Sequence, residues 1–200
     1  MSVQPHVLYL HGFLSSPQSL KAQQTLAYCL EIGLGETIAI PLMNHGPAET
    51  IAQLHALIDE NDTDQLVLMG SSLGGYYATY LSEFYQAPAV LINPAVRPYE
   101  LWESHLGENR NYYSDEVHVV TRAHIEQLKQ IDVPVLSQSK NFKVFLQKGD
   151  ATLDYRQALE KFGAGQCVVH EKGSHSYDDF EQEMPVMFDF FLSRIGENKR

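Results

Sequence analysis

Short runs of apolar, often β-branched residues recur along the chain and alternate with longer amphipathic stretches. The runs cover residues 7–10, 37–40, 66–69, 89–92, 143–146 and 167–170. They are continuous rather than alternating, which is typical of strands buried on both faces of a parallel sheet. Stretches with helical spacing lie between most of them, at 18–32, 47–60, 73–85, 154–162 and 180–195. This order predicts an α/β fold, a three-layer sandwich around a mainly parallel sheet of about six strands.

One interval between strands is about twice as long as the others, because the run at 89–92 is followed by the next only at 143–146. We expect residues 95–140 to form a partly helical insertion within a single domain spanning 1–200. Ligands of α/β sheets bind beyond the carboxyl ends of the strands, so an insertion leaving the strand at 89–92 can cover the site as a short lid. The alternative is a crossover with one extra helix and no role in binding.

A serine lies between an apolar run and an amphipathic helix, in the segment Gly70-Ser71-Ser72-Leu73-Gly74. This is the G-x-S-x-G pattern in its strand–turn–helix context, where glycines two positions before and after the serine leave room for a tight turn. A phosphate-binding turn is the alternative, but the dinucleotide fingerprint requires glycine at position 72, and no lysine stands where a P-loop requires one. We therefore predict that Ser72 is a nucleophile.

A serine hydroxyl needs a base and an orienting carboxylate, which on this strand arrangement follow in the order Ser, Asp, His. His175 lies just after the last predicted strand and is the expected base, while His170 inside that strand is expected to be structural. Asp150 follows the preceding strand and is the expected acid. Asp154 is kept as the alternative acid, although its position suits a helix cap.

Two backbone N–H groups are needed to hold a developing oxyanion. Leu73, directly after the nucleophile, supplies one, and Phe13 in the loop after the first strand is the best candidate for the other. His11 is expected to brace that loop. Three further aromatic residues, together with Phe13, are expected to form walls of the substrate pocket: Tyr76, Tyr99 and Trp102.

The composition excludes several classes of function. The formal net charge is −11, and Lys21 is the only basic residue before position 97, so no basic stripe for nucleic acid exists. Cys29 and Cys167 lie in apolar stretches and are expected to be buried free thiols. We expect no metal site and no cofactor. No apolar run approaches the length of about 18 residues that a spanning helix needs, and no signal peptide is evident, so the sequence predicts a cytoplasmic protein without a membrane partner.

The stretches LYLHGF at 8–13, GSSLGG at 70–75, INPAVRPYE at 92–100 and GD-x-x-LDYRQA from 149 together resemble the α/β-hydrolase superfamily. More narrowly, they look like the YqiA-like group of small bacterial esterases. This resemblance implies a minimal α/β-hydrolase fold without the first two strands of larger members, and serine-dependent hydrolysis of acyl esters and thioesters in the cytoplasm. It also implies the same triad of Ser72, Asp150 and His175, with Phe13 and Leu73 at the oxyanion.

The sequence thus predicts a carboxylesterase that cleaves small to medium acyl esters by a Ser-His-Asp acyl-enzyme mechanism. One alternative is an acyl-CoA thioesterase, in which Arg97, Arg110 or Arg122 would gather at the pocket mouth to meet the polyanionic CoA. Another is a ligand-binding protein of the same fold with little turnover. In each case the partner is a small molecule, and the sequence does not indicate an oligomeric state.

Overall fold

The computed structural model describes residues 4–43, 46–60 and 63–197, and within these six strands form one parallel sheet. The sheet order is β2-β1-β3-β4-β7-β8. The strands are β1 (His6–Leu10), β2 (Ile38–Ala39), β3 (Leu66–Ser71), β4 (Ala89–Ile92), β7 (Phe142–Gln147) and β8 (Cys167–His170). The register places Leu10 of β1 opposite Gly70 of β3. The predicted α/β fold with a six-stranded parallel sheet is confirmed.

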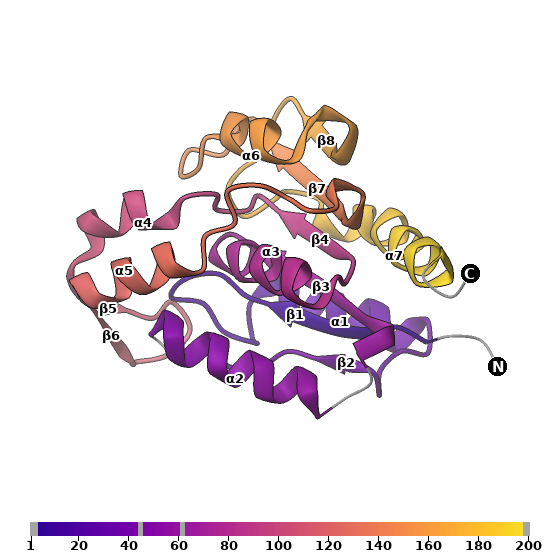
Figure 1. The fold of residues 1–200 in the computed structure, drawn as a ribbon, viewed down its shortest axis with the longest axis horizontal. Coiled ribbons are helices and arrows are strands. Elements are labelled where there is room, and N and C mark those ends of the chain that lie inside the picture. Colours follow the sequence, from indigo (N-terminus) through magenta and orange to yellow (C-terminus); the bar gives the residue numbers. More distant parts are fainter. Residues whose placement is uncertain (1–3, 44–45, 61–62, 198–200) are drawn as a thin grey trace.

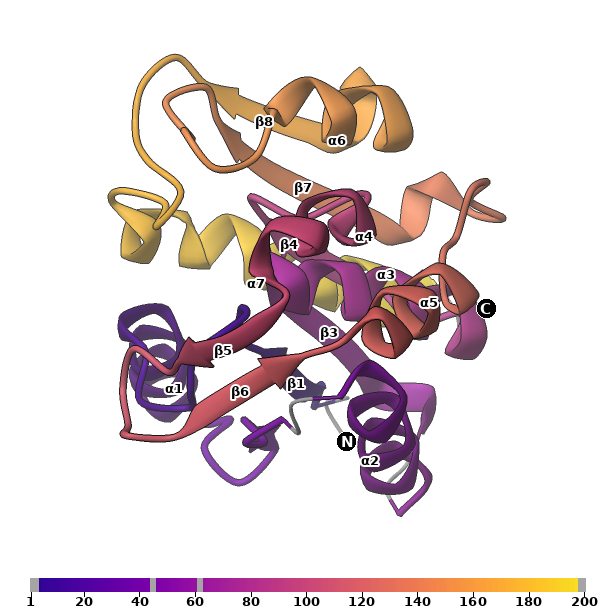
Figure 2. The ribbon, with the colours of Figure 1, turned by 90° about the vertical axis from the view of Figure 1, so that its left-hand side faces the viewer.

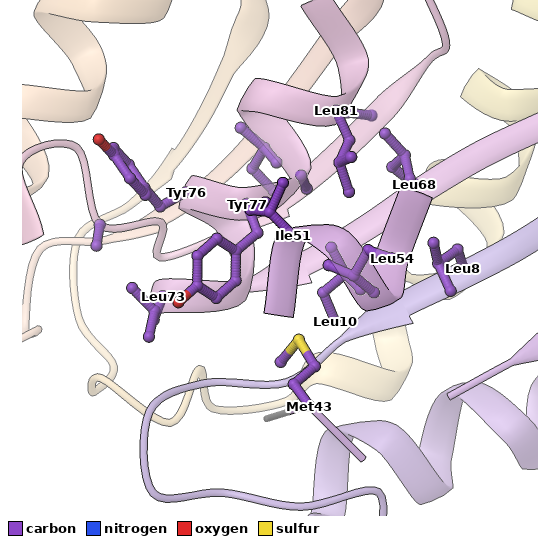
Figure 3. Packing of buried hydrophobic residues seen from close by; sticks show 14 of the residues in the cluster. Leu8, Leu10, Met43, Ile51, Leu54, Leu68, Leu73, Tyr76, Tyr77 and Leu81 are labelled. Carbon is purple, nitrogen blue, oxygen red and sulfur yellow. The ribbon is translucent and has the colours of Figure 1, made fainter. Parts of the chain in front are cut away.

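Alternate residues of each central strand point to opposite faces of the sheet, and each face has its own apolar core. One core contains the even-numbered side chains of β1 together with residues of helices α2 (Pro47–Asp59), α3 (Leu73–Tyr85) and α6 (Tyr155–Phe162). The odd-numbered ones pack with α1 (Leu20–Glu31) and α7 (Phe180–Glu197). Figure 1 shows the sheet running through the middle of the molecule, and Figure 3 shows part of the first core around Leu10, Leu54 and Tyr77. The three layers are therefore helices, sheet and helices.

The long segment between β4 and β7 contains both helices and a hairpin. Its elements are α4 (Pro98–Leu101), the 3-10 turn η2 (Trp102–His105), β5 (Gly107–Arg110), β6 (Val117–Val120) and α5 (Arg122–Gln130). β5 and β6 pair antiparallel as a separate two-stranded sheet. Figure 2 looks onto this end of the molecule, where the hairpin connects α4 to α5. The helices were expected, but the hairpin was not.

Most element boundaries lie within one or two residues of those predicted, and two of the differences are instructive. Helix α1 begins at Leu20 rather than at residue 18, because the Ser16 hydroxyl accepts a 3.0 Å hydrogen bond from the Gln18 N–H and forms a local turn before the N-cap at Ser19. β2 is only two residues long and lies at the edge of the sheet. Short 3-10 turns complete the structure at η1 (Thr63–Gln65), η3 (Ser139–Asn141) and η4 (Ala164–Gln166).

Candidate active site

Ser72 lies at the turn between β3 and α3 in a backbone conformation that few residues adopt. Its φ is 54° and its ψ is −121°, which costs a non-glycine residue about 1–3 kcal/mol. A Cβ at Gly74 would collide with the carbonyl oxygen of Leu10, and a Cβ at Gly70 would collide with the carbonyl of Gly74. Glycine is required at both positions because the elbow packs directly on its neighbours. The backbone therefore has the tight turn that the motif predicts.

The imidazole of His175 bridges Ser72 and Asp150. Its Nε2 lies 3.1 Å from the Ser72 hydroxyl oxygen, and its Nδ1 lies 2.7 Å from Asp150 Oδ2. The Asp150 carboxylate is 2% exposed, and its other oxygen accepts hydrogen bonds from the N–H groups of Thr152 (2.8 Å) and Leu153 (2.9 Å). The carboxylate is thus fixed in orientation. The three predicted residues come together in one hydrogen-bonded chain.

Asp154, the alternative acid, does not contact His175. It caps helix α6 by accepting a hydrogen bond from the Arg156 N–H at 3.0 Å. It also pairs with the Arg156 guanidinium, and the hydrogen bond from that side chain lowers the pKa of Asp154. Its role is that of a helix cap, which was the competing interpretation of this residue.

Two buried amide side chains hold the loop that carries His175. The Gln147 side chain accepts hydrogen bonds from the N–H groups of Ser174 (3.0 Å) and Asp178 (2.8 Å) and donates one to the Asp178 carbonyl (2.9 Å). The Asn93 side chain donates to the Ser174 carbonyl at 2.9 Å and accepts from the Gln147 N–H at 3.0 Å. Neither residue was predicted from the sequence. Each is a polar residue at the carboxyl end of a buried strand, and this is the signal that could have identified them.

The loop after β1 lies directly against the nucleophile. A Cβ placed on Gly12 would be only 3.3 Å from Ser72 Cβ, so this glycine allows the closest approach of the loop. Phe13 and Leu73, the two residues predicted to supply oxyanion N–H groups, both line the cavity that contains Ser72. The imidazole of His11 is buried, with Nδ1 3.0 Å from the Gly12 carbonyl oxygen, and burial lowers its pKa. These contacts suit the bracing role predicted for His11.

The segment between β4 and β7 holds this loop in place. The Phe13 ring packs against Trp102 with ring centroids 4.8 Å apart. The Asn111 side chain donates to the Ser15 carbonyl at 3.1 Å, and the Tyr112 N–H donates to the Leu14 carbonyl at 2.9 Å. The β5–β6 hairpin is therefore part of the wall around Ser72.

A cavity of about 580 Å³ opens beside Ser72 and His175. One end is apolar, with residues from the loop after β1 and from the segment after β4: Phe13, Leu73, Ala95, Pro98, Leu101 and Trp102. The other side is formed by the start of α1 and by the segment leading into α7. Its polar residues, which we call the polar end of the cavity, are Ser19, Lys21, Gln24, Ser176, Asp178 and Asp179, and the same elements also contribute Leu20, Tyr177 and Phe180.

Two of the aromatic residues expected in the pocket wall, Tyr76 and Tyr99, do not line the cavity. Tyr76 is 2% exposed and packs in the core shown in Figure 3, where its hydroxyl donates to the Leu128 carbonyl at 2.7 Å. Tyr99 donates to Asp132 at 3.1 Å, and burial together with that carboxylate raises its pKa to about 12. Helical spacing directs Tyr76 into the core, so its aromatic character was a misleading signal. Trp102 does line the cavity.

The remaining reactive side chains lie outside this site. His170 on β8 has its Nε2 2.8 Å from a Glu183 carboxylate oxygen and does not contact the triad, as expected of a structural residue. Cys29 and Cys167 are free thiols. Burial raises their pKa values to about 12 and about 11, so neither is a thiolate near neutral pH. Cys29 is buried as expected, but Cys167 is only partly so.

Comparison with solved structures identifies the fold. The chain is similar to Est1E from Butyrivibrio proteoclasticus with ferulic acid bound (TM-score 0.69, 14% identity, 96% of this chain and 90% of that one). It is also similar to mouse alpha/beta hydrolase domain-containing protein 10 (TM-score 0.69, 14% identity, 98% and 92%). A thioesterase domain from the curacin biosynthetic pathway is more distant (TM-score 0.56, 15% identity, 94% and 92%). At these identities the likeness establishes the α/β-hydrolase fold.

Within the described residues, no helix is both long enough and apolar enough to span a bilayer. The same part of the chain contains no group of three or more His, Cys, Asp or Glu side chains suited to hold a metal ion. The profile of one protein family, described as Uncharacterised protein family (UPF0227), matches residues 6–192. The chain therefore belongs to this family and has the α/β-hydrolase fold.

Proposed function

We propose that the protein is a serine carboxylesterase that cleaves small to medium acyl esters. The observation that carries this proposal is the hydrogen-bonded chain from the Ser72 hydroxyl through His175 to the buried Asp150 carboxylate. An imidazole oriented by a carboxylate can remove the proton from a serine hydroxyl, which otherwise is a weak nucleophile. The strained elbow presents that hydroxyl to the cavity.

In the first half-reaction, Ser72 Oγ forms a bond to the acyl carbonyl carbon while its proton moves to His175 Nε2. The N–H groups of Phe13 and Leu73 hold the negative charge that develops on the carbonyl oxygen. The intermediate collapses, the bond from the acyl carbon to the alcohol oxygen breaks, and His175 gives its proton to the departing alcohol. An acyl group is then attached to Ser72.

In the second half-reaction, a water molecule attacks the acyl-enzyme. His175 takes a proton from the water as its oxygen bonds to the acyl carbon. The bond to Ser72 Oγ breaks, and His175 returns the proton to that oxygen. One ester and one water thus yield one acid and one alcohol, and the enzyme returns to its starting state without a cofactor.

The size and lining of the cavity support the substrate class. A cavity of about 580 Å³, shared between an acyl group and an alcohol, accommodates small to medium acyl chains. In this proposal residues 95–140 serve as a lid, since Trp102 and Leu101 from this segment form much of the apolar end. The alternative of a plain crossover is less favourable because these side chains face the cavity.

The three arginines on which the acyl-CoA alternative depends do not lie at the cavity. None of the three candidate arginines lines the cavity. Each lies within 4.0 Å of a carboxylate instead: Arg97 near Glu100, Arg110 near Asp115 and Arg122 near Glu103. A CoA thioester would also approach a strongly acidic protein. We therefore expect kcat/KM for a simple ester to exceed that for the CoA thioester of the same acyl group.

The direct kinetic test replaces Ser72 by alanine and uses p-nitrophenyl butyrate as substrate. Loss of the nucleophile of a triad costs on the order of 10⁶ in kcat. Ser193→Ala, on the surface of α7, is the matched control and should retain wild-type activity. The assignment is wrong if Ser72→Ala keeps more than a tenth of that activity. A wild-type protein that binds ester without turnover would favour the ligand-binding alternative.

A further inference from the structure

The polar end of the cavity lies where β1, α1 and the loop before α7 meet, and the proposed chemistry uses none of its side chains. Ser176 and Asp178 come from the same loop as His175, so this end is continuous with the general base. Helices α1 and α7 are joined here by a hydrogen bond from the Gln24 amide to Glu181. The polar end is thus a structured surface.

Lys21 brings a cation to this end of the cavity. Among the described residues that line the cavity, it is the one lysine or arginine. Its ammonium group donates a 2.8 Å hydrogen bond to the carbonyl of Ser176, the residue after His175. Burial lowers the pKa of Lys21 to about 8, against the opposing effect of the Asp150 carboxylate. An ammonium group has three donors, so two remain for a bound molecule.

Tyr9, on β1, provides a second donor to the cavity. Its side chain is 1% exposed, yet it lines the cavity, and its hydroxyl has no hydrogen-bond partner among the described residues. Burial and the nearby Tyr113 raise its pKa, so the phenol stays protonated and can donate. The Tyr9 hydroxyl is not one of the fully buried side-chain atoms that lack a partner, so it is accessible from the cavity. It can therefore donate a hydrogen bond to a molecule bound there.

We propose that the polar end binds the alcohol part of the ester, and that this alcohol is a polyol carrying free hydroxyl groups, as glycerol or a sugar does. The inference rests on the proposed esterase function. His175 must protonate the departing oxygen, so the alcohol leaves on the side of the His175 loop, where Ser176 and Asp178 line the cavity.

The mixture of groups at this end selects among alcohols. Lys21 and Tyr9 donate hydrogen bonds, while the exposed carboxylates of Asp178 and Asp179 accept them. A polyol both donates and accepts and suits this mixture. An anionic alcohol would face the two carboxylates, and a simple alkyl alcohol would form no hydrogen bond with the Tyr9 hydroxyl.

The test compares two butyrate esters with the same acyl group, 1-butyrylglycerol and propyl butyrate. Both esters have the same acyl group and are cleaved by the same triad. The ratio of their kcat/KM values therefore measures recognition of the alcohol part. We expect the wild-type enzyme to prefer the glycerol ester by at least about tenfold. Tyr9→Phe should lower this ratio by about threefold to tenfold, the effect of one lost hydrogen bond. Lys21→Met should lower the ratio similarly and should also slow both esters, because the tether to Ser176 is lost.

Tyr80→Phe is the matched control, since Tyr80 lies on α3 away from the cavity and should leave the ratio unchanged. The polyol subsite would be refuted if the wild-type enzyme had equal kcat/KM values for the two esters, or if Tyr9→Phe left the preference unchanged. Either result would leave the proposed esterase function unaffected. If neither ester is hydrolysed and a serine-directed probe does not label Ser72, the proposed function itself fails.

Discussion

The amide of Gln147 should control how well His175 is positioned, and replacing it by methionine tests this. Methionine has a similar length and is apolar, so the variant removes three hydrogen bonds to the His175 loop while largely keeping the packing. At a net value of about 1 kcal/mol each, their loss should lower the free energy of unfolding by about 2–4 kcal/mol. If the loop moves the His175 imidazole by about 1 Å, the rate falls by up to ~100-fold. We therefore expect kcat/KM to fall by about 10- to 100-fold.

Urea unfolding gives the stability of the Gln147→Met variant, and hydrolysis of p-nitrophenyl butyrate per folded molecule gives its activity. Gln182→Met, at an exposed position of α7, is the matched control and should behave like wild type in both assays. If Gln147→Met matches this control in stability and activity, the hydrogen bonds do not hold the loop. If stability falls while activity stays at the wild-type level, Gln147 supports the fold but does not position His175.

Three further substitutions test separate parts of the account. Asp150→Asn should lower kcat by about 10⁴-fold, as loss of the orienting carboxylate does in other triads. Asp154→Asn should keep kcat within about threefold of wild type. Steady-state kinetics of the two variants therefore distinguishes the two carboxylates. Gly74→Ala should destabilise the protein by at least about 1–3 kcal/mol in urea unfolding, because its Cβ would collide with the Leu10 carbonyl, and a variant as stable as wild type would contradict the elbow geometry. Lys21, whose pKa falls to about 8 on folding from its ordinary 10.5, binds its proton more weakly in the folded state. As the pH rises from about 8 to 10.5, the free energy of unfolding of the wild-type protein should therefore increase by about 1–3 kcal/mol relative to that of Lys21→Met. Parallel curves of stability against pH, measured by urea unfolding, would refute this.

The features predicted from sequence are those with a local cause. Continuous apolar runs identify the strands of a buried parallel sheet, because few other contexts tolerate them. The elbow is visible because its geometry requires glycine two positions before and after Ser72. His175 and Asp150 follow from strand order alone, since the carboxyl ends of parallel strands meet at one edge.

The features missed depend on contacts between distant segments. The β5 strand, Gly107–Arg110, is polar and exposed, so nothing local distinguishes it from a loop. Its hairpin is fixed by hydrogen bonds from Asn111 and Tyr112 to the loop after β1, nearly 100 residues earlier. Tyr76 was misplaced because an aromatic residue near the nucleophile suits a pocket wall and a core equally well.

The proposed mechanism requires a Ser72 hydroxyl that is activated by His175 and exposed to the cavity. Mass spectrometry after reaction with a fluorophosphonate measures this most directly, because the reagent phosphonylates only activated serines rapidly. We expect stoichiometric modification of the wild-type protein on the peptide that contains Ser72, and no modification of Ser72→Ala or, at the same reaction time, of His175→Ala. An unmodified wild-type protein, or a Ser72→Ala variant that is modified equally fast, would contradict the proposed mechanism.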